Sequence, residues 1–250
     1  KDGFICDIKD ALMYVPKKPL GLKSKGHLGS DYYMTPNPEV GAVITYFVKD
    51  VPKTAKQKRQ EKEEKMISNK ETKMPYPAID SLRVEDNQQK PYLLFTFTDE
   101  KGDVITHVKK PASKGLQRMT WDMRYAPNDA IDNRYYPGPD ELWGSAPQGQ
   151  LIMPGKYNVT MSMVFNGEIT QLSGPKSFTT KLLNQASLPS RDLADNHAFC
   201  RKVSDVTKTL SATNDRYSKI RSRVVDATKA VYDMPAPVGS LIKELHAIEQ

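Results

Sequence analysis

Apolar and polar residues alternate along several segments in the first two thirds of the chain, a pattern typical of strands with one buried face. The clearest case is residues 91–98, where Leu93, Phe95 and Phe97 form one wholly apolar alternate set and are expected to face the core. A turn follows, and residues 104–108 are expected to return as the second strand of an antiparallel hairpin. We expect this hairpin to be central to the fold.

Other segments with the same period surround this hairpin. Strands are expected at residues 41–48, 116–123, 156–165, 168–172 and 176–182. The expected inward residues are Met119, Trp121 and Met123 in one of these strands and Tyr157, Val159, Met161 and Met163 in another. Asn166-Gly167 predicts a tight hairpin turn. This succession of short strands predicts an antiparallel β-sandwich, which tells more about architecture than about activity.

After Pro189 the apolar period lengthens from two residues to about three and a half. The apolar stripe consists of Phe199, Val203, Val206, Leu210, Thr213, Tyr217, Ile220, Val224, Ala227 and Val231. It predicts a long amphipathic helix that begins near Asp192 and ends before Pro235, with a possible break at 211–214 that would make two helices. Residues 241–248 predict another helix that folds back on the first. Residues 189–250 are therefore expected to form a long-helix hairpin. The second helix is too short to cover the whole apolar stripe, so the rest is expected to be covered by further helix after residue 250 or by packing on the sandwich.

A charged segment at residues 53–73 separates two of the expected strands. It contains strong helix formers but almost no apolar face, so it predicts an exposed or partly ordered helix supported by Glu/Lys pairs. A nucleic-acid-binding arm is the alternative, and it is disfavoured because glutamates neutralise the lysines and no aromatic residues are interleaved for stacking on bases. Residues 78–86 are expected to form a short helix.

Composition adds few constraints. The chain has 250 residues, 18 prolines and a net charge of +7, but its lysines are mostly interleaved with acidic residues, which favours a solvated surface over an anionic partner. Cys6 and Cys200 are far apart and are expected to be unpaired, although one disulfide is possible. No apolar run is long enough to predict a membrane span. The chain does not begin with Met, so residues 1–40 are interpreted as a linker or the remnant of an upstream domain.

Motifs for familiar catalytic sites are missing from the sequence. It has no G-x-S-x-G, H-E-x-x-H, G-x-G-x-x-G or P-loop pattern. The histidines are scattered and form no ligand pair; they are His27, His107, His197 and His246. Each is interpreted as a surface residue.

The best remaining place for a site is a long irregular excursion at residues 125–150. Its acidic residues offer oxygen ligands for Ca²⁺, although without the D-x-D-x-D-G order, or a carboxylate pair for glycoside hydrolysis; they are Asp129, Asp132, Asp140 and Glu141. Its aromatic residues Tyr135, Tyr136 and Trp143 offer a platform for a sugar or a protein partner. The alternative, which we prefer, is that these aromatic side chains pack the excursion onto the sheet edge.

Four stretches carry a resemblance to known families: residues 37–47, 91–102, 113–124 and 153–160. They resemble the region that follows the β-propeller in bacterial sortilin-like (BNR-repeat) proteins, which are often labelled glycosyl hydrolases. An Asp-x-x-Gly hairpin at Asp99, a Gly-x5-Trp-Asp strand ending at Asp122 and a Pro-Gly-x-Tyr strand at Pro154 are also similar to the immunoglobulin-like module of hook-capping and secretion-sorting proteins.

The resemblance implies an extracytoplasmic bacterial protein, whether periplasmic, outer-membrane-associated or secreted, with a β-propeller upstream in the same chain. The expected fold is mainly β with α. An immunoglobulin-like antiparallel β-sandwich at 41–184, with insertions at 53–90 and 125–150, precedes the helical hairpin at 189–250. Any catalytic carboxylates of such a protein would lie in the propeller, so none is assigned here.

The function expected from this resemblance is that of a non-catalytic accessory region, which packs on the propeller or mediates contact with another protein. The alternative is a carbohydrate-binding module that uses the aromatic residues of 125–150 to bind a polysaccharide. An enzymatic role is a third and weaker hypothesis.

Overall fold

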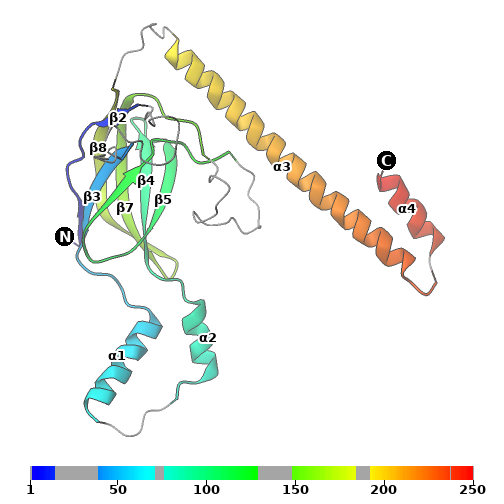
Figure 1. Cartoon of the computed structure of the whole chain (residues 1–250), viewed down its shortest axis with the longest axis horizontal. Coiled ribbons are helices and arrows are strands. Elements are labelled where there is room, and N and C mark those ends of the chain that lie inside the picture. Colours follow the sequence, from blue (N-terminus) through cyan, green and yellow to red (C-terminus); the bar gives the residue numbers. More distant parts are fainter. Residues whose placement is uncertain are drawn as a thin grey trace, which may run out of the picture. The chain divides into compact units, whose positions relative to one another are not determined.

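The computed structural model describes residues 2–14, 39–70, 76–128, 148–183, 192–236 and 238–249. It is a mixed α/β structure with two β-sheets and a C-terminal pair of helices (Figure 1). The chain divides into two compact units. The first, here called the sheet unit, contains the described residues up to 126 and those of 151–183; the helical unit contains the described residues of 127–150 and those from 192 onwards.

The strands of the sheet unit form two sheets. The three-stranded sheet has the order β1 (Gly3–Ile5), β3 (Ala42–Val48), β6 (Gly115–Trp121), and all its pairs are antiparallel. The five-stranded sheet has the order β2 (Ala11–Met13), β8 (Glu168–Leu182), β7 (Gly155–Phe165), β4 (Tyr92–Asp99), β5 (Val104–Pro111). Its β2–β8 pair is parallel and its other pairs are antiparallel.

Buried side chains from both sheets form one hydrophobic core. Trp121 of β6 stacks on Phe97 of β4 with ring centroids 4.1 Å apart, and Tyr46 of β3 meets Phe95 of β4 at 4.9 Å. The alternation rule is confirmed for all three expected inward sets. Every member of these sets is buried: Leu93, Phe95 and Phe97; Met119, Trp121 and Met123; and Tyr157, Val159, Met161 and Met163.

Gly41 allows β3 to lie close to β6. Its φ is +141°, and a Cβ atom at this position would lie 2.2 Å from the backbone oxygen of Trp121. Because backbone atoms cannot move aside as a flexible side chain can, only glycine fits here. The close approach of the chain just before β3 to the Trp121 backbone therefore depends on the missing side chain.

The turn between β7 and β8 has the predicted geometry. Asn166 and Gly167 have φ values of 52° and 84°, so both central residues are left-handed, as a type I′ hairpin requires. The prediction of two short strands after this turn was wrong, because β8 runs unbroken through Pro175. The missing N–H of Pro175 is tolerated because the β7–β8 register shifts near Val159 and β2 pairs with β8 only from Thr180 onwards.

The first residues of the chain, interpreted as a linker or the remnant of an upstream domain, contain two short strands. Residues 3–5 and 11–13 are strands, one in each sheet. The parallel pairing of 11–13 with β8 makes the larger sheet mixed, where a purely antiparallel one was expected. Three-residue strands are too short to show a period, so the alternation rule does not detect them.

Two helices follow β3 before the chain re-enters the sheet at β4. They are α1 (Ala55–Ser68) and α2 (Ile79–Asn87), and they lie beyond the ends of the strands (Figure 1). Neither has a buried residue, in agreement with the predicted exposed helix at 53–73 and short helix at 78–86.

The helical unit contains one unbroken helix, α3 (Leu193–Tyr232), and the shorter α4 (Gly239–Glu249). The residues 211–214 thus do not break the long helix. α4 folds back beside the C-terminal end of α3, as predicted (Figure 1). Cys200 in α3 and Cys6 in the sheet unit are both free thiols.

Replacement of Gly41 by alanine is expected to destabilise the sheet unit by at least about 2 kcal/mol, because the new Cβ must displace the Trp121 carbonyl and adopt a disfavoured φ. Gly174→Ala is the matched control, since a Cβ there meets nothing within 4 Å, and it should change stability by less than about 0.5 kcal/mol. Urea unfolding followed by tryptophan fluorescence measures both. Equal effects of the two substitutions would contradict the close approach of β3 and β6.

Candidate functional site

The site residues expected from the sequence lie outside the described residues. They are Asp129, Asp132, Asp140 and Glu141 for calcium, and Tyr135, Tyr136 and Trp143 for a sugar or protein partner. The structure therefore does not say whether these side chains come together. Both hypotheses stay predictions.

Among the residues that are described, no group of three or more His, Cys, Asp or Glu side chains is placed to hold a metal ion. No described helix is both long enough and apolar enough to cross a membrane. The remaining candidates are surface features: two hollows in the sheet unit and the uncovered face of α3.

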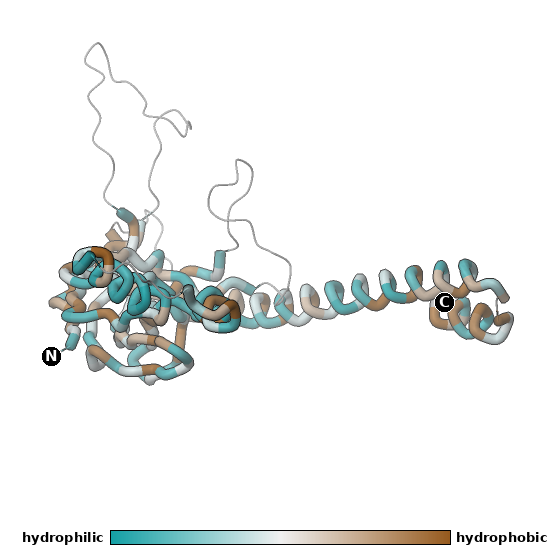
Figure 2. The backbone as a smooth tube through the Cα atoms, turned by 90° about the horizontal axis from the view of Figure 1, so that it is seen from below, coloured by the Kyte–Doolittle hydropathy of each residue, from teal (hydrophilic) through white to brown (hydrophobic). Residues whose placement is uncertain are grey.

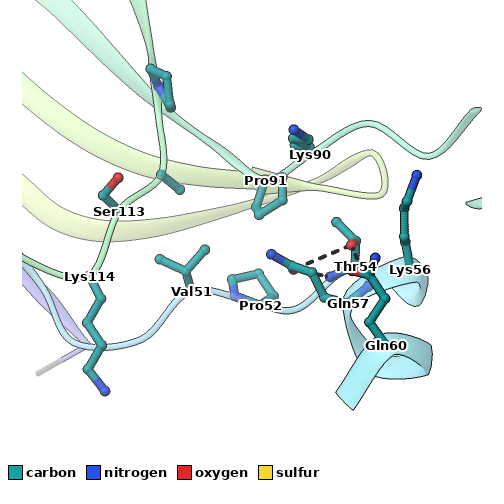
Figure 3. A pocket seen from close by; sticks show the side chains of 12 residues that line it. Val51, Pro52, Thr54, Lys56, Gln57, Gln60, Lys90, Pro91, Ser113 and Lys114 are labelled. Carbon is teal, nitrogen blue, oxygen red and sulfur yellow. Dashed lines mark hydrogen bonds between the residues drawn. The ribbon is translucent and has the colours of Figure 1, made fainter. Parts of the chain in front are cut away.

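The larger hollow, of about 550 Å³, lies where the start of α1 meets the start of β4 and the β5–β6 connection (Figure 3). Lys56, Lys90 and Lys114 line it, together with neutral polar and apolar side chains. Lys114 extends away from the other two lysines in Figure 3 and pairs with Asp50 at 2.9 Å. The lysines thus do not converge on one point, as they would to bind a compact anion.

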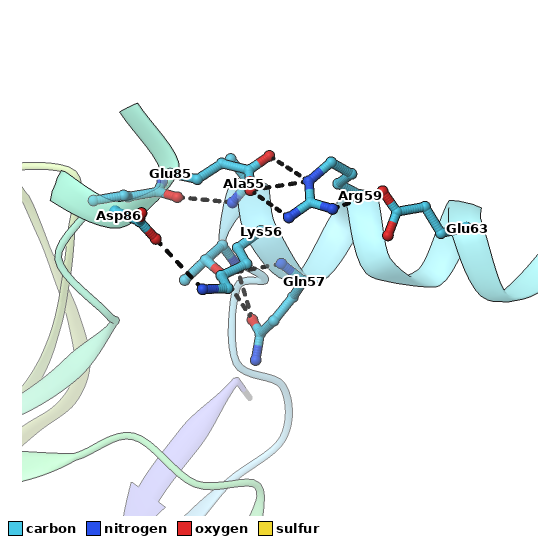
Figure 4. Close-up of polar contacts among 9 residues, drawn as sticks. Ala55, Lys56, Gln57, Arg59, Glu63, Glu85 and Asp86 are labelled. Atoms are coloured by element: carbon cyan, nitrogen blue, oxygen red, sulfur yellow. Dashed lines mark hydrogen bonds and ion pairs between the residues drawn. The ribbon is translucent and has the colours of Figure 1, made fainter. Parts of the chain in front are cut away.

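The start of α1 beside this hollow is held by a capping box (Figure 4). The Thr54 hydroxyl accepts a hydrogen bond from the backbone N–H of Gln57 at 3.2 Å, and the Gln57 side chain accepts one from the backbone N–H of Thr54 at 2.9 Å. Gln88 adds a third bond: its side-chain oxygen accepts from the N–H of Ala55 at 2.7 Å. The amide nitrogen of Gln88 donates to Asn166 in the β7–β8 turn at 2.9 Å, so one side chain joins α1 to the sheet.

Arg59 joins α1 to α2. Its guanidinium group donates to Glu85 of α2 through Nε at 3.0 Å and NH2 at 2.9 Å, and to Glu63 through NH1 at 2.6 Å (Figure 4). The bonds to Glu85 and then to Glu63 raise the pKa of Arg59 above its already high usual value. This fork-shaped contact orients two helices that share no buried apolar residue. The pairing was not predicted from the sequence, although the charged helix was.

A second hollow, of about 370 Å³, lies beside β2 and the start of β3. It is lined by apolar side chains with Lys9, Asp10 and Glu39 at its border. The carboxylate of Asp10 pairs with Lys181 and that of Glu39 accepts from Thr120. Both acidic groups are therefore engaged in contacts that hold strands together.

The third candidate is an apolar seam along α3, formed by the stripe Phe199, Val203, Val206, Leu210, Thr213, Tyr217, Ile220, Val224, Ala227 and Val231. Most of it is uncovered: the exposed fractions of Phe199, Leu210 and Tyr217 are 65%, 63% and 62%. An exposed apolar stripe of this length on a helix is a feature of surfaces that meet another helix.

α4 covers only the C-terminal end of this seam. Val231 is buried to 7% exposure and Val224 is half-buried, as are Ile242 and Leu245 of α4. Figure 2 shows α4, with apolar and polar stretches in turn, beside that end of α3. The seam therefore accepts an amphipathic helix where one is present, and it is exposed at Ile220 and at the apolar positions before it.

A different face of α3 contacts the last residue of the 125–150 excursion. The side chain of Gln150 donates to the backbone oxygen of His197 at 3.5 Å, and Ser204 on the same face is buried. Burial lowers the pKa of His197 below its usual value, and the positive charge of Arg201 adds to this effect. The described contact with 148–150 thus leaves the seam uncovered.

Comparison of the chain with protein-family models, with curated proteins and with solved structures finds no match. The resemblance to sortilin-like propeller proteins and to immunoglobulin-like modules therefore stays a prediction.

Replacement of Arg59 by alanine is expected to release α1 from α2, because it removes the bonds to Glu85. Limited digestion with trypsin should then cleave faster at the remaining lysines of α1, while the strands stay resistant. Arg83→Ala is the matched control, since the pair that Arg83 forms among the described residues lies within α2, with Asp80 at 3.5 Å. Unchanged cleavage in the Arg59 variant would show that another contact holds the helices.

Acid is expected to weaken the helical unit through His197. Because the folded pKa lies below the ordinary value of about 6.5, the unfolded chain binds the proton more tightly, and stability falls as the pH drops below about 6.5. An NMR titration should give His197 a pKa below 6.5, and Arg201→Gln should raise it because one of its two causes is removed. A pKa at or above 6.5 in the native chain would contradict the burial of this imidazole.

Proposed function

We propose that this chain is a non-catalytic accessory region whose role is contact with a protein, made through the seam of α3. The observation that carries the proposal is the exposure of apolar side chains at Phe199, Leu210 and Tyr217, on a helix that is covered by α4 only near Val231. Isolated helices are marginally stable in water, and most helical stability comes from packing of the apolar face. A helix of 40 residues with this face uncovered is therefore suited to a partner.

The sheet unit supplies a rigid support in this proposal. We interpret its two sheets as an immunoglobulin-like sandwich with α1 and α2 inserted between β3 and β4. The shared core of the two sheets supports this interpretation, as does the left-handed β7–β8 turn.

The resemblance of residues 37–47, 91–102, 113–124 and 153–160 to the region after a bacterial β-propeller suggests the biological setting. In that setting the protein is extracytoplasmic, and its partner is the propeller of the same chain or another protein at the cell surface. The parent would then belong with the glycosyl-hydrolase-like propeller proteins, and any catalysis would reside in the propeller.

A photo-activated cross-linking residue placed at position 210 tests the contact function in the cells that produce the protein. Position 208 lies on another face of the same helix and is the matched control. We expect adducts from position 210 that position 208 does not give, with the partner segment identified by mass spectrometry. Identical adducts at both positions, or none at either, would contradict the proposal. So would turnover of glycoside substrates by the purified chain that Asp132→Ala abolishes.

A further inference from the structure

The seam of α3 has a definite charge pattern at its borders. Its residues alternate at spacings of four and three, so they occupy the two apolar positions of a heptad, with Phe199 at d and Val203 at a. The flanking e and g positions beside them are Cys200, Lys202, Thr207, Thr209, Asn214, Arg216, Arg221, Arg223, Thr228 and Ala230.

These borders are basic on both sides. Lys202, Arg216 and Arg223 lie on one side and Arg221 on the other, while the remaining flanking positions are uncharged. The acidic residues of α3 beyond Phe199 are kept away from the borders, at c and f positions; they are Asp205, Asp215 and Asp226. The e and g positions of a coiled coil determine which helix it accepts, because their side chains meet those of the partner.

This pattern disfavours a second copy of the chain as the partner. In a parallel pair of identical helices, Arg216 of one copy would face Arg221 of the other, and the reverse contact would repeat the repulsion. In an antiparallel pair, borders of the same kind face each other, and these carry only basic or uncharged residues. Over residues 199–231, neither an in-register parallel pair nor an antiparallel pair of two copies gives the basic borders an opposite charge; Asp195, at a g position, lies before this stretch.

α4 sets the length that is left for a partner. α4 has 11 residues and α3 has 40, so at 1.5 Å per residue α4 covers about 16 Å of a helix that is about 60 Å long. The exposed seam from Phe199 to Ile220 leaves roughly three heptads. One amphipathic helix of about 20 residues, longer than the average helix of about 11–12 residues, spans this length.

We propose that the seam between Phe199 and Ile220 binds an amphipathic helix of another protein whose apolar stripe is bordered by Asp and Glu. The apolar side chains supply the buried area, and the four basic residues at the borders pair with the acidic borders of the partner. This inference rests on the proposed contact function and adds the chemistry of the partner.

A pair of synthetic peptides tests the charge requirement. Both have three to four heptads with Leu and Ile at the a and d positions; one has Glu at every e and g position and the other has Lys there. Fluorescence anisotropy with the whole chain should show the Glu peptide binding about tenfold or more tighter than the Lys peptide. The difference should shrink as salt is raised from about 50 to about 500 mM, because exposed charges are screened.

Two variants of equal charge change locate the site. Arg216→Glu with Arg223→Glu alters the border and should remove or invert the preference for the Glu peptide. Lys208→Glu with Lys229→Glu makes the same change at f positions, away from the seam, and should preserve the preference. Circular dichroism checks that both variants retain the helix. Leu210→Asp should abolish binding of either peptide.

The outcomes separate this inference from the contact function. Equal affinity for the two peptides, or an equal response of the two double variants, would overturn the inference that the partner helix has acidic borders. A dimer at micromolar concentration that Leu210→Asp dissociates would also overturn it and assign the seam to a second copy. If position 210 cross-links to a partner segment without acidic borders, the contact function holds and the charge requirement fails. If neither cross-linking nor peptide binding is seen, both fail.

Discussion

The stacking of Trp121 on Phe97 is the interaction on which the sheet unit depends. The two rings come from different sheets, and their centroids are 4.1 Å apart. The indole nitrogen of Trp121 is buried without a hydrogen-bond partner in the part of the chain that the structure describes, so apolar packing alone holds the ring. Loss of a buried aromatic side chain typically costs about 3–5 kcal/mol, which is a large part of the stability of a small domain. Gly41 allows this arrangement because it lets β3 approach the Trp121 backbone.

Away from this core, polar contacts and apolar contacts have separate roles. α1 and α2 share no buried side chain and are held by directed hydrogen bonds, from Arg59 to Glu85 and from Gln88 to both α1 and the β7–β8 turn. α3 has the opposite character: its seam is apolar, and only α4 is shown to cover part of it. Directed polar bonds thus hold α1 and α2 to each other and to the sheet, whereas α3 has an apolar face suited to a further partner.

The sequence predicts those parts of the fold in which a period is long enough to be recognised. Phe95 and Phe97 lie in a strand with a clear alternation, and the stripe from Phe199 to Val231 gives a helix of the expected extent. Prediction from the sequence fails for β2, whose three residues show no period. It also fails for β8, where Gly174-Pro175 indicates a break but the strand continues because the β7–β8 register shifts.

The candidate sites also differ in how far the sequence predicts them. The apolar stripe of α3 is predicted from its spacing in the sequence, whereas its exposure and the extent that α4 covers come from the structure. The link between Arg59 and Glu85 joins residues 26 positions apart across two helices, and no local pattern indicates such a pair. The acidic and aromatic residues of 129–147 lie outside the described residues, so the calcium and carbohydrate hypotheses are untouched by the structure.

The central claim is that none of the described residues covers the seam of α3 before the region where α4 packs. Hydrogen–deuterium exchange of the purified chain, read by mass spectrometry, tests it directly. We predict rapid exchange in peptides from 199–220, slower exchange in 224–232, where α4 packs, and the slowest exchange in β4 and β7, which lie inside the five-stranded sheet. Protection of 199–220 as strong as that of β4 would mean that another part of the chain already covers the seam, and would contradict the account.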